Sequence, residues 1–385
     1  MAANSGPARR RTLPSLRDDA IVAIIARCPL ASHDALRVCC RRFSRLAERR
    51  AIKRHRASVG WGENAIVVAG GDFHMGDPID IDRDETHALI GGRWREMQSQ
   101  PRSRCDCCVV TWRGRMVCAG GCITAWDTEA GELVMSVGVP ELVAFDAAED
   151  RWLDMANPGE RVLPSKGAAL VCPITGALVI ISGNGGWSKG ETSGLRPGQS
   201  RRAMVALDSP EAAAWRLLAP PPIHVHAFFA EVIGEKLYLA GGWNIDWEEP
   251  SEPSDALWIY EFRTNTWSLG PPLPWPQYFG GGCALGSKLY VVSGKHARDE
   301  RTSDVVIYDT VAESWTVGPP LPEPLEYFTA IVHQNRIVVI GDRSPLILDE
   351  TAGVWVHDPD VVPPLPWVPP DKPLYAAMTA SVPVG

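Results

Sequence analysis

Five cysteines lie close together in the sequence and are of the residue type that binds zinc: Cys105, Cys107, Cys108, Cys118 and Cys122. Their C-x-C-C and C-x-x-x-C spacings do not match a zinc finger or a zinc ribbon. On an extended strand Cys105 and Cys107 share one face and Cys108 points to the other, which disperses the ligands. The spacing therefore favours buried, reduced thiols, and we expect no metal and no other cofactor.

A pair of histidines, His224 and His226, is the second candidate for metal binding. The two are expected on one face of a strand, but no third ligand is evident in the sequence. A Gly-rich phosphate loop, a G-x-S-x-G nucleophile elbow and an H-E-x-x-H zinc motif are all missing from the sequence. These observations favour hydrogen-bonded histidines and a protein that is not an enzyme.

Composition is that of a globular protein, with 45% hydrophobic and 22% charged residues in a chain of 385. No apolar run approaches the roughly 18 residues of a membrane span. The N-terminal residues lack the apolar segment of a secretory signal, so a cytoplasmic or nuclear location is expected. Residues 1–58 hold 14 Lys and Arg against 4 Asp and Glu, whereas the other 327 hold 24 against 42. Opposite charge in the two parts predicts two modules.

An apolar run that ends in two glycines, or in a close variant, recurs along the larger part. It occurs at 66–71, 116–121, 178–183, 237–242, 289–294 and 337–342. An apolar strand, a polar turn and a tryptophan follow each time, with the tryptophans at Trp94, Trp152, Trp215, Trp267, Trp315 and Trp355. Proline-rich turns such as 271–274, 319–322 and 363–366 come after the tryptophans. Each repeat therefore holds about four short strands separated by turns.

Four-stranded units that repeat six times with these landmarks are typical of a six-bladed β-propeller. The residues resemble the kelch repeat family over roughly 62–385. Agreement is strongest in the fourth and fifth repeats and weakest in the first, where an acidic insert occupies 72–86. The expected fold class is therefore mainly β, a kelch propeller preceded by a small α-helical module. Leu374–Ala380 resembles an inner strand, and we expect it to complete the first blade beside residues 65–71.

Short amphipathic helices are expected in the basic part. Ile21, Ile25 and Cys28 fall at helical spacing, Pro29 ends that helix, and Ser32 can cap a second one. Two or three helices in so short a segment cannot bury a core of their own, so an apolar face should remain for a partner.

Residues 13–46 closely resemble the plant-type F-box that precedes kelch repeats. Landmarks include Leu13-Pro14, Asp18-Asp19 and the segments 26–29 and 36–39, while Cys40 and Phe43 depart from the usual Arg and Trp. The expected domains are a disordered basic tail at 1–12, the F-box at 13–50, a linker at 51–61 and the propeller at 62–385.

This resemblance implies an adaptor of a Skp–cullin–F-box ubiquitin ligase, in which the F-box binds the Skp-type adaptor and the propeller binds a protein substrate. No membrane contact and no direct nucleic-acid contact are expected. The likeness assigns the Skp-type contact to Leu13, Pro14, Leu16, Ile21, Ile25, Pro29, Leu36, Val38, Cys39 and Phe43.

Substrate recognition is expected on the face where the loops after the diglycine strands open, since loops on a rigid scaffold usually carry recognition. His226, Tyr278 and Glu326 occupy equivalent positions before three inner strands and should surround the mouth of the channel. Acidic residues at 72–85 and 248–252 suggest a basic patch on the substrate. The expected substrate-binding residues are Trp187, His226, Trp243, Asn244, Trp247, Tyr278, Arg298, Arg301 and Glu326.

Two alternatives remain at this point. One is a kelch scaffold that binds partners without ubiquitin transfer. The other is a metalloenzyme, since some kelch propellers are copper or iron enzymes. The iron-dependent specifier proteins share the pattern E-x-x-x-D-x-x-x-H, of which this chain keeps Glu300 and Asp304 but has Tyr308 in place of the histidine. That departure disfavours iron.

Overall fold

The computed structural model divides into two compact units, Ala65–Val382 and Met1–Asn64 with Pro383–Gly385. It describes residues 21, 64–71, 84–127, 132–158, 163–181, 203–244, 252–296, 300–341, 344–368 and 378–383. Ile21 has a helical backbone and is buried; the other proposed F-box contacts lie outside the described residues. Among the residues that are described, no helix is long and apolar enough to cross a membrane.

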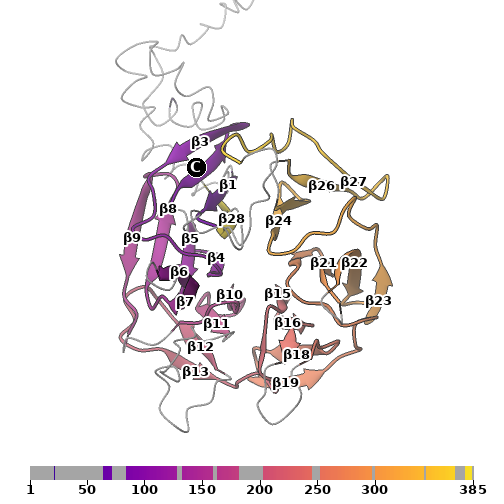
Figure 1. Cartoon of the computed structure of the whole chain (residues 1–385). Coiled ribbons are helices and arrows are strands. Elements are labelled where there is room, and N and C mark those ends of the chain that lie inside the picture. The colour runs from indigo at the N-terminus through magenta and orange to yellow at the C-terminus, as the bar shows by residue number, and fades with distance from the viewer. Residues whose placement is uncertain are drawn as a thin grey trace, which may run out of the picture. The chain divides into compact units, whose positions relative to one another are not determined.

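Six four-stranded antiparallel sheets form the larger unit and stand in a ring, as Figure 1 shows. This arrangement is a six-bladed β-propeller. The first three blades are β28-β1-β2-β3 (Met378–Pro383, Asn64–Ala69, Thr86–Ile90, Arg93–Met97), β4-β5-β8-β9 (Cys108–Trp112, Arg115–Ala119, Leu142–Asp146, Arg151–Met155) and β10-β11-β12-β13 (Ala168–Val171, Leu178–Ile181, Met204–Leu207, Arg216–Leu218). The last three are β15-β16-β18-β19 (Phe229–Ile233, Lys236–Ala240, Leu257–Glu261, Thr266–Leu269), β20-β21-β22-β23 (Gly281–Leu285, Lys288–Lys295, Arg301–Asp309, Ser314–Val317) and β24-β25-β26-β27 (Thr329–His333, Arg336–Ile340, Leu346–Asp349, Val354–Val356).

The first blade is completed by the C-terminal strand, as the sequence predicts. β28 is the inner strand and pairs with β1, although it spans Met378–Pro383 rather than 374–380. The Thr111 hydroxyl of the second blade donates to the carbonyl oxygen of Ser381 at 2.9 Å, which also ties β28 to its neighbour. The ends of the propeller sequence are therefore joined within one sheet.

Two short pairs of strands lie outside the six blades. β6 (Cys122–Asp127) pairs with β7 (Glu132–Gly138), a pairing that the four-stranded repeat does not predict. β-branched residues, which favour strands, occur in both segments, among them Ile123, Thr124, Val134 and Val137. β14 (Val225–His226) pairs with β17 (Trp243–Asn244).

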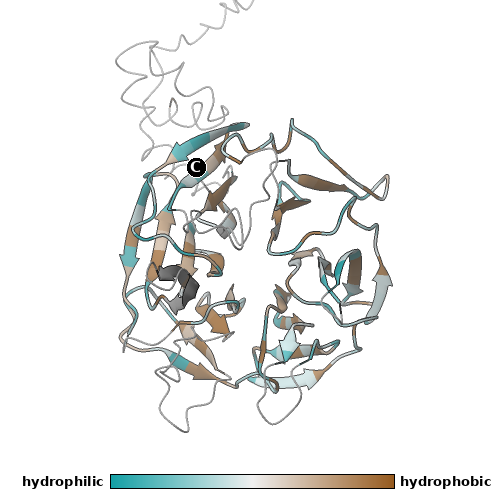
Figure 2. Cartoon of the chain, viewed as in Figure 1, coloured by the Kyte–Doolittle hydropathy of each residue, from teal (hydrophilic) through white to brown (hydrophobic). Residues whose placement is uncertain are grey.

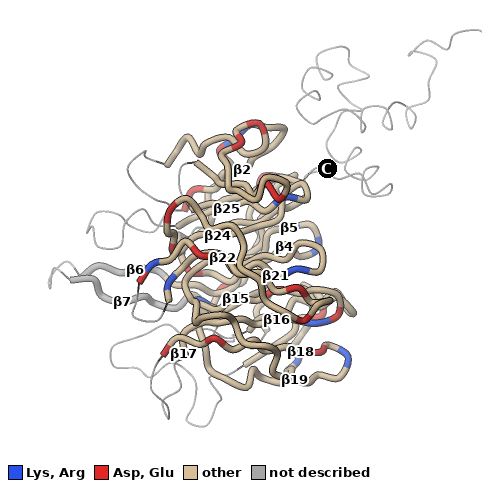
Figure 3. Tube along the Cα trace, turned by 90° about the vertical axis from the view of Figure 1, so that its right-hand side faces the viewer, with Lys and Arg blue, Asp and Glu red and all other residues tan. Residues whose placement is uncertain are grey.

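Apolar side chains fill the spaces between adjacent blades. One cluster joins Ile66 and Val68 of the first blade to Val338 and Ile340 of the last. Similar clusters join the second blade to the third, the third to the fourth, the fourth to the fifth and the fifth to the last. Figure 2 shows hydrophobic residues on the strands throughout the ring, and Figure 3 shows that charged residues gather mainly in turns and loops. Burial of each large side chain contributes about 2 kcal/mol, so the ring is stabilised chiefly by these interfaces.

The proline-rich turns contribute to the same interfaces. Leu273, Leu321 and Leu365 are the leucines of the three Pro-Pro-Leu-Pro segments, and all are buried. Each belongs to the apolar cluster that joins its blade to the next. Each turn therefore places a buried leucine side chain between two blades, in addition to connecting strands.

Each of the six tryptophans of the repeat has a structural role, because its indole N–H donates a hydrogen bond to the preceding blade. The donors and acceptor oxygens are Trp152 to Gln98 (3.0 Å), Trp215 to the Asn157 side chain (2.9 Å), Trp267 to Ala219 (2.9 Å), Trp315 to Pro271 (2.9 Å), Trp355 to Pro319 (2.8 Å) and Trp94 to Pro363 (2.8 Å). The six bonds form one closed set around the ring.

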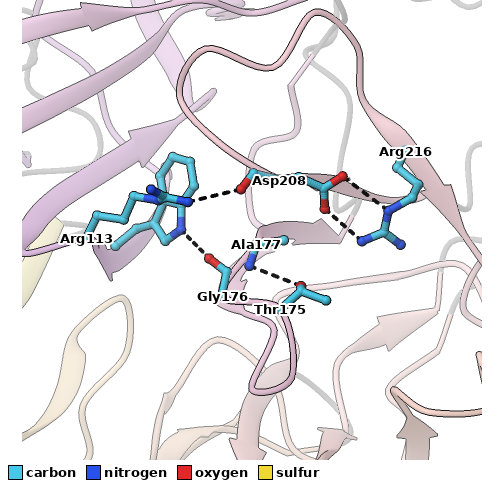
Figure 4. A network of polar contacts seen from close by, with 7 residues as sticks. Arg113, Thr175, Gly176, Ala177, Asp208 and Arg216 are labelled. Carbon is cyan, nitrogen blue, oxygen red and sulfur yellow. Dashed lines mark hydrogen bonds and ion pairs between the residues drawn. The ribbon is translucent and has the colours of Figure 1, made fainter.

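Polar contacts link the second and third blades at the turns that follow the inner strands β4 and β10 and the third strand β12 (Figure 4). The Arg113 guanidinium donates to the carbonyl oxygen of Asp208 at 3.2 Å, and the Asp208 carboxylate pairs with Arg216 at 3.0 Å. The Trp112 indole donates to the Gly176 carbonyl oxygen at 2.7 Å. These turns lie at the opposite end of the strands from the candidate site described next.

Candidate binding site at the channel mouth

Five residues, one from each of five blades, form a continuous belt just before the inner strands. All have left-handed backbones, with φ of 54° at Asp106, 53° at Lys166, 52° at Ala227, 56° at Phe279 and 55° at Tyr327. The backbone N–H of each of the last four donates to the carbonyl oxygen of the belt residue before it, at 3.0 Å from Lys166, 3.1 Å from Ala227, 3.2 Å from Phe279 and 3.0 Å from Tyr327. We call these five residues the mouth belt.

Left-handed conformation at non-glycine residues costs about 1 kcal/mol each, and such strain is often found at functional sites. Four of the five belt residues carry a side chain larger than that of alanine. The chain of backbone hydrogen bonds holds these side chains in fixed positions around the mouth.

The diglycine turns bring a second set of residues up to the belt. Gly241 and Gly242 have φ of 62° and 96°, and a Cβ on Gly241 would lie 2.3 Å from the carbonyl oxygen of Gln277 in the next blade. This close approach requires glycine. The residue after the turn, Trp243, then pairs with His226, which directly precedes the belt residue Ala227. Cys122 pairs with Cys105 and Lys295 with Tyr278 in the same way.

Lys166 is held among aromatic rings and a carboxylate. Its ammonium nitrogen lies 5.0 Å from the ring centre of Phe279 and 5.6 Å from that of Tyr327. The same nitrogen is 3.5 Å from a carboxylate oxygen of Asp106. Four of the five belt residues therefore form one cluster in which a cation faces two aromatic rings.

A buried carboxylate organises the cations on the other side of the mouth. Glu326 is 9% exposed and pairs with Lys295 at 2.9 Å and with Arg301. Lys295 and Arg301 face each other across β21 and β22, and the Lys295 ammonium also lies 5.8 Å from the ring centre of Phe279. Because Glu326 belongs to the next blade, the carboxylate fixes both cations across a blade interface.

His226 is kept neutral at the mouth. Burial lowers the pKa of its imidazole to about 4, assisted by the positive charge of Lys166 and by His224. Its ring centre is 5.8 Å from that of Phe279, and its buried Nδ1 has no hydrogen-bond partner among the described residues. Beside it, the rings of Trp243 and Tyr278 are 4.9 Å apart. The mouth thus combines aromatic faces with three cations and two carboxylates.

Of the nine residues expected to bind substrate, the structure brings five together here: His226, Trp243, Tyr278, Arg301 and Glu326. Asn244 follows Trp243 in β17 and donates its backbone N–H to Glu252 at 2.8 Å. Trp187, Trp247 and Arg298 lie outside the described residues, as do most of the acidic loop residues. Sequence reasoning missed Asp106, Lys166, Phe279, Tyr327 and Lys295.

The five clustered cysteines do not face one common point, and neither do the two histidines together with a third ligand. The Cys107 and Cys108 thiols point to different carbonyl oxygens, those of Gly120 at 3.2 Å and Pro164 at 3.8 Å. Cys105 lies instead against Cys122. The seven cysteines that the structure describes are all thiols. His224 and His226 belong to no three-residue group of ligands within the described part of the chain.

Comparison with known proteins identifies the repeat. The family model described as "Kelch motif" matches residues 226–274 and 278–322, which contain the fourth and fifth blades. The fold is therefore a six-bladed propeller of kelch type. The blades that agree best with the kelch pattern are thus the same two for which the sequence resemblance is strongest.

Several curated kelch proteins are similar to this chain. The rat Kelch-like protein 36 is 23% identical over 286 residues, which cover 70% of this chain and 42% of that protein. The human Kelch repeat and BTB domain-containing protein 12 is 29% identical over 84 residues, 21% of this chain and 14% of that protein. The Myxoma virus Kelch repeat protein M-T8 is 27% identical over 159 residues, 41% and 28% of the two chains. The chain matches less than half the length of these relatives.

A solved structure has a similar fold. The protein titled "Structure of YjhT" superposes with a TM-score of 0.56 at 12% identity, over 75% of this chain and 96% of that one. At this identity the likeness concerns the fold alone.

Proposed function

We propose that the chain is the substrate-recognition adaptor of a Skp–cullin–F-box ubiquitin ligase in the cytoplasm or nucleus. The kelch propeller would bind the protein substrate at the mouth belt, and residues 13–50 would bind the Skp-type adaptor and through it a cullin. Support for the second part is the F-box landmarks of residues 13–46. The kelch repeats that follow them support the pairing of the two modules.

The observation that carries the substrate-binding part is the cluster of Lys166, Phe279 and Tyr327 at the mouth. Each of these side chains is half-buried, so part of its surface remains available to a partner. Aromatic residues on a rigid scaffold are typical anchors of protein interfaces, and adjacent cations add specificity. Their fixed backbones reduce the entropy that binding would otherwise cost.

An adaptor of this kind makes and breaks no covalent bond. It holds a substrate near the ubiquitin-conjugating enzyme, which raises the effective concentration of the substrate's lysines at the site of transfer. The mouth belt fits this role, because it offers a binding surface without needing a nucleophile or a general base.

The test compares proteins captured by the native chain with those captured by a Phe279→Ala, Tyr327→Ala double variant. A Leu217→Ala, Val311→Ala variant is the control, since these exposed side chains lie outside the mouth belt. We expect the control to retain the captured proteins and the mouth variant to lose them, and their lifetimes to lengthen when the chain is removed from cells. Captured proteins whose lifetimes stay the same would instead support a scaffold without ubiquitin transfer.

A further inference from the structure

Cys105 and Cys122 form a cross-strand pair beside the mouth belt. The backbone N–H of each donates to the carbonyl oxygen of the other at 2.9 Å, so the two are a hydrogen-bonded antiparallel pair. Paired residues of this kind project their side chains to the same face. The two Sγ atoms are accordingly 3.5 Å apart, and both residues are buried.

Asp106 brings a carboxylate to the same place. In a regular strand it would point away from Cys105, but its left-handed backbone (φ 54°) breaks the alternation. The hydrogen bond from Lys166 N–H to its carbonyl oxygen fixes this conformation. One carboxylate oxygen lies 3.9 Å from the Cys122 Sγ, and the ligand atoms of all three residues lie within 4.8 Å of one another.

We propose that Cys105, Asp106 and Cys122 bind a zinc ion, with the fourth coordination position open. Zn–S bonds of about 2.3 Å and Zn–O bonds of about 2.0 Å in a tetrahedron place two sulfurs about 3.8 Å apart and a sulfur and an oxygen about 3.5 Å apart. The Cys105–Cys122 separation of 3.5 Å and the Cys122–Asp106 separation of 3.9 Å differ from these values by a few tenths of an ångström, which side-chain rotation supplies.

Charge balance supports zinc at this site. Two thiolates and a carboxylate carry three negative charges, and a divalent ion with the neighbouring Lys166 ammonium, 3.5 Å from Asp106, carries three positive charges. Without metal, two neutral thiols and the Lys166–Asp106 pair are also neutral. One zinc ion therefore replaces two thiol protons, which pass to solvent, and no oxidation takes place.

Softness of the ligands favours zinc over magnesium or calcium, which prefer oxygen. Because Asp106 belongs to the mouth belt, the open position would border the mouth. Three protein ligands with one open position are the arrangement in which zinc accepts an exchangeable fourth ligand.

The test uses the full chain without an affinity tag, kept reduced with a phosphine and freed of metal with a chelator. Cobalt(II) serves as the spectroscopic probe, since thiolate ligation gives an intense charge-transfer band and tetrahedral geometry gives strong visible bands. We expect both bands in the native chain and their loss on adding zinc. The chain has further cysteines, among them Cys28, Cys39 and Cys40, so the variants decide the assignment.

Cys105→Ala and Cys122→Ala should each abolish the charge-transfer band that saturates first, and Asp106→Asn should weaken cobalt binding by about tenfold. Cys283→Ala, which removes a buried thiol from the fifth blade, is the matched control and should bind as the native chain does. Cooperative melting confirms that each variant folds, and Cys122→Ser replaces an alanine variant that does not. A native chain without the bands, a band that survives at Cys122→Ala and Cys122→Ser, or a Cys105–Cys122 disulfide in the reduced sample would overturn the proposal.

Discussion

The indole N–H of Trp94 donates a 2.8 Å hydrogen bond to the carbonyl oxygen of Pro363, across 269 residues of sequence. The bond joins the first blade to the segment that follows the last. It repeats the link that the other five tryptophans make between neighbouring blades. Together with β28, it makes the ring continuous where the first and last segments of the propeller sequence meet.

Replacement of Trp94 tests the energy of this link. Trp94→Phe keeps an aromatic ring but removes the N–H donor, and the Pro363 carbonyl loses its partner. We expect the free energy of unfolding, measured with urea, to fall by about 1 kcal/mol. Trp258→Phe is the matched control, because the Trp258 N–H is buried without a hydrogen-bond partner among the described residues. Equal losses in the two variants would show that the N–H bond contributes nothing.

Removal of β28 tests ring closure. Deleting residues 378–385 exposes the inner edge of β1 and removes the buried side chains of Ala380 and Val382. We expect the melting temperature to fall by about 5–10 °C or more, measured by circular dichroism. Deleting residues 384–385 alone leaves the strand intact and should leave the melting temperature unchanged. A longer deletion with no effect would mean that β28 does not stabilise the first blade.

Glu326 should be needed for the geometry of the mouth. Glu326→Gln removes the charge that compensates Lys295 and Arg301, so two cations remain close together. We expect the free energy of unfolding to fall by about 2 kcal/mol, less than for a wholly buried pair because Arg301 is partly exposed. Glu323→Gln changes an exposed carboxylate nearby in the sequence and serves as the control. If both variants are as stable as the native chain, the ion pairs have no structural role.

His226 predicts a specific pH dependence. Because burial lowers the pKa of the folded imidazole from 6.5 to about 4, the unfolded chain takes up a proton there before the folded chain does. Stability is therefore lost as the pH falls from about 6.5 to about 4, by at most about 1.4 kcal/mol per pH unit from this group. Urea unfolding of His226→Asn should show a shallower decline over that range. Parallel declines in both proteins would contradict the shift.

Most of the fold follows from the sequence, because each landmark has a local physical cause. Gly241 is required where the second strand meets the next blade, and Trp267 is required where an indole crosses to the preceding blade. Because such requirements recur once in each repeat, the glycines and tryptophans recur at regular intervals in the sequence. Among the residues that the structure describes, the β6–β7 hairpin belongs to a single repeat, so the period gives no sign of it.

The candidate site was predictable only in part. Equivalent positions in the repeats identified His226, Tyr278 and Glu326 as mouth residues. The next residue along, such as Phe279 or Tyr327, was missed because strand alternation would point it away, and only its left-handed backbone turns it to the mouth. These residues could have been found by aligning the repeats and examining the residue that lies two positions before each inner strand.

Alternation also hides the Cys105–Cys122 pair. It relates Cys105 to Cys107, which are close in sequence, whereas the hydrogen-bonded bridge brings Cys105 to a residue after the diglycine turn. Contacts between strands depend on how the strands are aligned with each other, and the spacing of residues within one strand does not reveal that alignment.

Binding to a Skp-type adaptor tests the central claim most directly. The measurement is co-purification of the adaptor with three forms of the chain: native, Leu13→Ala with Pro14→Ala, and the mouth variant Phe279→Ala with Tyr327→Ala. We predict that the native and mouth forms bring the adaptor with them and that the Leu13, Pro14 variant does not. A well-folded native chain that fails to bind the Skp-type adaptor would contradict the ubiquitin-ligase role and leave a kelch propeller that binds its partner alone.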